Sequence, residues 1–93
     1  MAARERSGPM SPLGRLYRME YARLRSRFPD QDPLERDRYI LLTLAFAFMD
    51  VDGEELARAM VEGSHEVRLL HNQGISDTVR EMADRATATA RKL

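Results

Sequence analysis

Few residues in this chain are of a type that could carry chemistry. Two histidines, His65 and His71, surround Glu66 in an order close to that of the zinc proteases. In the zinc motif the second histidine follows the first by four residues, so that both rings lie on one face of a helix. A separation of six turns the rings about 240° apart. The spacing therefore argues against a metal pair, and we expect both histidines to be exposed to solvent.

An acidic cluster, Asp50, Asp52, Glu54 and Glu55, raises the question of a calcium site. A calcium loop of the EF-hand type needs oxygen donors at positions 1, 3 and 5 and a glutamate at position 12. Counted from Asp50, position 12 is Val61. We interpret the cluster as the end of one helix and the start of the next, and we expect no metal.

The chain also has no nucleophile with a histidine at an informative spacing and no cofactor motif. It has no cysteine and no glycine-rich phosphate loop, and Ser64 beside His65 is an adjacency without the spacing of a catalytic pair. We therefore expect a non-enzymatic protein with no cofactor. The absence of cysteine, together with an N-terminal stretch that lacks a leader-like apolar run, predicts a cytoplasmic location.

Charge is unevenly distributed along a chain whose formal net charge is zero. Residues 1–28 carry a net charge of +5, residues 29–62 a net charge of −6 and residues 63–93 a net charge of +1. On a helical wheel Arg15, Arg18 and Arg25 lie opposite the apolar stripe of residues 12–28, while Arg23 and Arg27 flank it. The candidate partner-binding residues are Arg15, Arg18, Arg23, Arg25, Arg27 and Tyr21.

Two functions are compatible with this arginine-rich segment. The first is protein–protein interaction, in which the segment packs beside acidic or apolar surfaces. The alternative is a nucleic-acid-binding regulator, because residues 74–81 resemble the turn and recognition helix of helix-turn-helix proteins. That segment has one residue fewer between Ser76 and the Thr78–Val79 pair than the usual motif, and Asp77, Glu81 and Asp84 would repel phosphates.

The element expected to organise the fold is the apolar run 39–49, YILLTLAFAFM. A helix that is apolar on all sides is buried on all sides, so we expect a central strut. Eleven residues span about half of the 30 Å that a membrane helix must cross, so no membrane segment is expected.

Start and stop signals divide the chain into four helices, at about 12–28, 33–49, 53–72 and 76–92. Ser11, Asp32 and Asp52 are predicted N-caps, the last two with a glutamate three residues on, and Gly74 is a predicted C-terminal stop. The pair Gly63–Ser64 could split the third helix, which would give five helices.

These elements predict an all-α fold, namely a small up-and-down bundle of four helices, or five if the third is split, around a central apolar helix. Residues 1–10 are expected to form a disordered tail and residues 11–93 a single domain. Exposed apolar residues such as Leu16, Met19, Tyr21 and Leu69 would remain on a monomer, so a homodimer is expected. We interpret the protein as a self-associating interaction or adaptor protein that also binds an unidentified protein partner.

Overall fold

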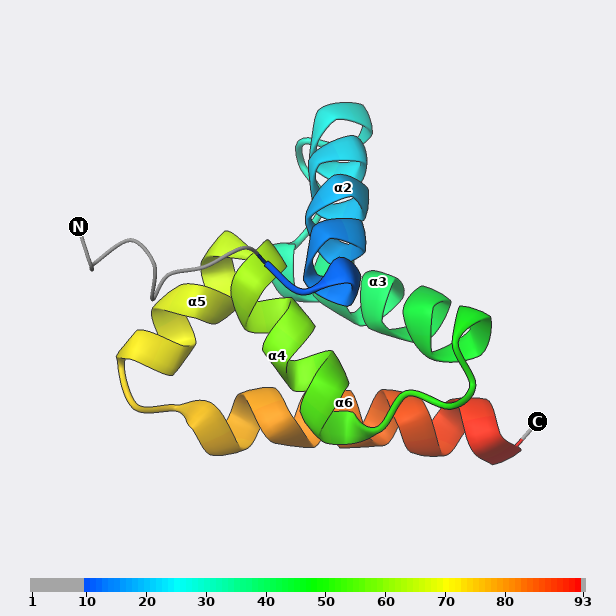
Figure 1. Ribbon diagram of the computed structural model, residues 1–93. Coiled ribbons are helices and arrows are strands. Elements are labelled where there is room, and N and C mark those ends of the chain that lie inside the picture. The colour runs from blue at the N-terminus through cyan, green and yellow to red at the C-terminus, as the bar shows by residue number, and fades with distance from the viewer. Residues whose placement is uncertain (1–9, 93) are drawn as a thin grey trace.

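The computed structural model describes residues 10–92, and within that range the chain forms helices and no strands (Figure 1). The five helices are α2 (Pro12–Arg27), α3 (Pro33–Ala47), α4 (Gly53–Gly63), α5 (His65–Asn72) and α6 (Ser76–Lys92). The predicted all-α class is confirmed. Residues 1–9, which make up most of the expected tail, lie outside the described residues.

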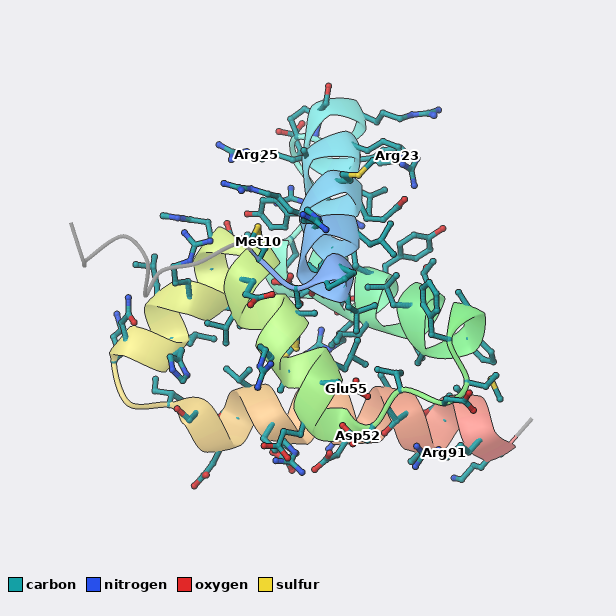
Figure 2. All side chains as sticks on the ribbon, in the orientation of Figure 1. Met10, Arg23, Arg25, Asp52, Glu55 and Arg91 are labelled. Atoms are coloured by element: carbon teal, nitrogen blue, oxygen red, sulfur yellow. The ribbon has the colours of Figure 1, made fainter. Side chains whose placement is uncertain are left out.

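Helices α2, α3 and α4 begin at the N-cap residues that were predicted from the sequence. Ser11 accepts a hydrogen bond from the backbone of Gly14, and Asp32 accepts one from Glu35. At the start of α4 the capping box is complete, since Asp52 and Glu55 each accept a hydrogen bond from the other's backbone N–H (Figure 2). These side chains satisfy N–H groups that the first turn of a helix leaves without partners.

The break between α4 and α5 confirms the five-helix alternative. Ser64 has extended backbone angles, φ −114° and ψ 126°, and it is both the last cap of α4 and the first cap of α5. Its hydroxyl accepts a hydrogen bond from the backbone N–H of Val67 at 3.3 Å. After α5, Gly74 adopts the left-handed conformation expected of a helix stop, with φ 83°.

The centre of the core is α4. Its residues Leu56, Ala59 and Met60 are fully buried, and α4 packs against α2 on one side and α6 on the other. Gly63 permits the approach of α2, because a Cβ atom there would lie 2.8 Å from the backbone nitrogen of Arg18. The interface between α2 and α4 is the largest between any two helices.

The expectation that the run 39–49 forms a central strut is wrong. Helix α3 buries one face, which includes Ile40, Leu41 and Leu44, and leaves another in solvent. It also ends at Ala47, so Phe48 lies beyond the helical segment and is exposed. The physical reason is that α3 packs mainly against α6 and α2 at the side of the molecule, and no described element covers its outer face.

The up-and-down order of helices is not confirmed. The principal partner of α2 is α4, which is not its neighbour in the chain, and α6 packs against both α3 and α4. In Figure 1 the axis of α2 is steeply inclined to the axis of α6. Among the described helices, none combines the length and the apolar character that a membrane span requires.

Candidate functional site

The arginines of α2 do not form one surface. All five are exposed, but Arg18 and Arg25 line a hollow shared with α5, whereas Arg23 and Arg27 line another beside Tyr39. Figure 2 shows Arg23 and Arg25 on opposite sides of α2. This division follows the helical wheel, on which residues seven apart share a face and residues two apart do not.

Two of these arginines contact residues close to them in sequence. Arg23 forms an ion pair with Glu20 at 2.6 Å, and the guanidinium of Arg27 lies 5.8 Å from the centre of the Phe28 ring, just after the end of α2. Arg15 is exposed and lines neither hollow.

Tyr21 is buried, with 6% of its surface exposed, so the expectation that it remains on the surface of a monomer is wrong. Its hydroxyl donates a hydrogen bond to the carboxylate of Glu66, which connects α2 to α5. The guanidinium of Arg36 lies 5.3 Å from the centre of its ring. Burial and the Glu66 contact raise the pKa of Tyr21 to about 12. Leu16, Met19 and Leu69 are exposed as expected.

A continuous apolar surface follows the outside of α3. Tyr39, Leu42 and Phe46 are 53%, 36% and 42% exposed, and we call these three residues the outer face of α3. Leu42 also lines a groove of about 330 Å³ between α3 and α6. The apolar lining of the groove comes from Leu34, Leu41, Leu42, Met82 and Ala86, and its charged lining from Arg38, Glu81 and Arg85.

A buried polar cluster holds α2, α3 and α5 together. The carboxylate of Asp37 is fully buried, and it accepts hydrogen bonds from the hydroxyl of Tyr17 at 2.7 Å and from that of Ser64 at 3.1 Å. Burial raises the pKa of Asp37 to about 6, although both hydrogen bonds favour the charged form and act to lower it. Burial and the nearby carboxylate also hold the pKa of Tyr17 well above its usual value.

The guanidinium of Arg36 lies close to this cluster and is itself 3% exposed. Its Nη2 donates to the backbone oxygen of Gln31 at 3.4 Å, while its Nε has no hydrogen-bond partner among the described residues. The side-chain oxygen of Gln31 is buried and lacks a partner there as well. Since neither Asp37 nor Arg36 lines any of the hollows described above, we interpret the cluster as structural.

The burial of Asp37 was not predicted from the sequence. A signal was present, because Asp37 precedes Ile40, Leu41 and Leu44 by three, four and seven residues. These spacings place the carboxylate on the buried face of α3. A charged residue in register with an apolar face predicts either burial with hydrogen-bond partners or a bend of the helix away from the core.

One further pair of side chains could in principle take part in catalysis. The hydroxyl of Ser76 lies 3.1 Å from Nδ1 of His71, but both residues are exposed at the turn between α5 and α6 and line none of the hollows above. Over residues 10–92, no three histidine, aspartate or glutamate side chains are grouped so that they could hold a metal ion.

Comparisons of the chain with protein-family models, with curated proteins and with solved structures return no match.

Proposed function

We propose that the protein is a non-enzymatic interaction protein that forms a homodimer through the outer face of α3. The observation that carries this proposal is the exposure of Tyr39, Leu42 and Phe46, which follow one another at intervals of three and four residues. Such spacing lines up side chains along one face of a helix. A row of exposed apolar side chains along one face of a helix is typical of a protein–protein contact.

A second copy of the chain fits this face better than an unrelated partner. The groove beside Leu42 is lined by Arg38 and Arg85 and also by Glu81, so both signs of charge border the same apolar surface. A two-fold axis sets a surface against itself, and because Arg85 pairs with Glu81 at 3.7 Å and Arg38 pairs with Glu35, this border brings no unpaired charge of one sign to the contact. The formal net charge of zero means that two copies do not repel each other at long range.

The size of the chain supports self-association as well. A domain of this length buries a smaller share of its surface than a larger one, so burial in a dimer adds useful stability. Helix α3 leaves more large apolar side chains exposed than any other described helix, namely Tyr39, Leu42 and Phe46, because protein contacts cover only one side of it. A dimer through the outer face of α3 would bury these exposed side chains. The helix would then be covered on all sides, as its apolar sequence predicted.

The nucleic-acid-binding alternative has less support. The arginines of α2 face different directions, and Arg23 is already paired with Glu20. In the segment that resembles a helix-turn-helix, Asp77, Glu81 and Asp84 are all exposed on α6. The nearby Arg80 pairs with Asp84 at 3.1 Å, which reduces what it could offer to a phosphate.

Sedimentation velocity tests the dimer. We expect the wild-type protein to sediment as a dimer at micromolar concentration and the double variant Leu42→Glu, Phe46→Glu to sediment as a folded monomer. The matched control is Leu69→Glu, which adds charge at an exposed leucine on α5 and should leave the dimer intact. A wild-type protein that stays monomeric, or a dimer that survives the double variant, would rule out this face as the interface.

A further inference from the structure

A second surface lies between α2 and α5, on the side of α2 that carries Arg18 and Arg25. The hollow has a volume of about 510 Å³, within the range of about 300–1,000 Å³ typical of small-molecule sites. We call it the basic hollow. Its charged and polar lining comes from Arg18, Arg25, Ser26, His65 and Arg68, with Tyr21 at its edge.

The lining includes three arginines and no carboxylate. The acidic residues closest in sequence to its α4 and α5 walls are not among the lining residues, and both accept hydrogen bonds from other side chains. Glu66 accepts a hydrogen bond from Tyr21, and Glu62 accepts one from the hydroxyl of Ser11 at 2.8 Å. The positive charge of the hollow is therefore not neutralised by a carboxylate within it.

Part of this charge is held in place before any ligand arrives. The guanidinium of Arg68 donates to the backbone oxygens of Val61 and Glu62, at 3.3 Å and 2.9 Å, which fixes it at the end of α4. Gly63 and Ala22 also line the hollow, and their small side chains leave its space open. A guanidinium that is already fixed loses little conformational entropy when a ligand binds. The fold therefore reduces the entropic cost of binding at Arg68.

We propose that the basic hollow binds a compact phosphate-bearing small molecule, namely a phosphate monoester or a diphosphate. Arginine matches the tetrahedral oxygens of phosphate with paired N–H donors, and here arginines from two helices border one open hollow. His65, at the first position of α5, adds a ring nitrogen and lies at the positive end of a helix.

A compact anion suits this arrangement better than a nucleic-acid strand. A strand that followed α2 would need arginines spread along one exposed line, whereas Arg23 and Arg27 lie at a different hollow from Arg18 and Arg25. The arginines of α2 are thus divided between two hollows and do not form one line along the helix. This site is separate from the outer face of α3, so the proposal stands whether or not the protein is a dimer.

Calorimetric titration with inorganic pyrophosphate at low ionic strength tests the site. We expect binding by the wild type, and a loss of at least about tenfold in affinity for the double variant Arg18→Gln, Arg25→Gln. The control is Arg15→Gln, Arg23→Gln, which removes the same charge from the same helix outside the hollow and should change affinity by less than about twofold. All four positions are exposed, so both variants should keep the fold, as circular dichroism can verify.

Amide chemical shifts locate the ligand independently of affinity. Pyrophosphate should shift the backbone amide signals of Ala22, Gly63 and His65 in the wild type. Absence of binding at about 10 mM pyrophosphate would overturn the proposal. So would an equal loss of affinity in the two double variants, which would mean unspecific attraction along α2. Tighter binding of single-stranded DNA than of pyrophosphate, lost in both variants, would overturn it in favour of a nucleic-acid surface.

Discussion

The hydroxyl group of Tyr17 donates a hydrogen bond of 2.7 Å to Oδ1 of Asp37, which joins α2 to α3 inside the protein. The other carboxylate oxygen accepts from Ser64 at 3.1 Å, at the break between α4 and α5. One side chain thus connects three parts of the fold that are far apart in sequence. Burying a carboxylate is costly without such partners, and even with them its charged form is disfavoured.

The variant Asp37→Asn should change how stability depends on pH. The pKa of Asp37 is raised to about 6 in the folded protein, from an ordinary 3.8. Since the folded state holds the proton more tightly, the stability that this group contributes is complete below pH 3.8 and is lost as the pH rises through about 6. The loss amounts to about 3 kcal/mol at pH 8. Relative to the wild type, the unfolding free energy of Asp37→Asn in urea should rise by about that amount between pH 4 and pH 8.

The control for this prediction is Asp50→Asn, which changes an exposed aspartate at the end of α3. Its unfolding free energy should run parallel to that of the wild type over the same range. If Asp37→Asn also runs parallel, then Asp37 titrates near its ordinary pKa and its burial carries no cost.

The variant Tyr17→Phe should destabilise the protein more at neutral than at acidic pH. It removes the 2.7 Å donor to Asp37 and leaves the ring that fills the core. A hydrogen bond to a charged group contributes about 1.5–3 kcal/mol, roughly twice as much as one between neutral groups. We expect a loss in that range at pH 8 and about half of it at pH 4, measured by urea unfolding.

The comparison is Tyr17→Phe made in the Asp37→Asn variant, where no charge can form at position 37 and the loss of stability should therefore be the same at pH 4 and pH 8. Equal losses for Tyr17→Phe at pH 4 and pH 8 would show that its hydroxyl does not interact with a charged Asp37.

The variant Gly63→Ala should be destabilising although alanine favours helices. An added Cβ atom would lie 2.8 Å from the backbone nitrogen of Arg18 and 2.9 Å from Cβ of Tyr17, so α2 itself would have to move. Overpacking of this kind costs about 1–3 kcal/mol, against a gain of about 1 kcal/mol from helix propensity. The atoms nearest to a Cβ at Gly14 belong to the side chain of Glu62, which can turn away at the loss of its hydrogen bond with Ser11, so Gly14→Ala should cost less when both variants are compared by thermal unfolding. The reverse order would mean that α2 and α4 can separate freely at Gly63.

The sequence predicted those features that depend on local chemistry. The starts of α2, α3 and α4 follow from Ser11, Asp32 and Asp52, since each cap acts within three residues of itself. The stop at Gly74 follows from a left-handed conformation that glycine adopts at little cost. These features require no knowledge of the rest of the chain.

The features that were missed depend on contacts far apart in sequence. The burial of Asp37 was not predicted, and the donors that make its burial possible lie 20 and 27 residues away. The covered side of α3 is set by where α2 and α6 pack, which its own apolar sequence does not reveal. The helical wheel of α2 placed Arg25 and Arg23 on different faces. It could not show that α5 would lie beside Arg25 and form a hollow with it.

A dimer through the outer face of α3 also predicts that thermal stability depends on protein concentration. Dimerisation stabilises the folded state by an amount that grows with the logarithm of the protein concentration. The midpoint of thermal unfolding should therefore rise as the protein concentration rises. For a dimer of 93-residue chains, a tenfold increase should raise Tm by about 3–4 °C. In Leu42→Glu, Phe46→Glu the Tm should not respond to concentration, because these side chains are exposed in the monomer and contribute mainly to the contact between copies. If the wild-type Tm is constant over a hundredfold range, folding is not coupled to association, and the apolar stripe of α3 is tolerated on a stable monomer.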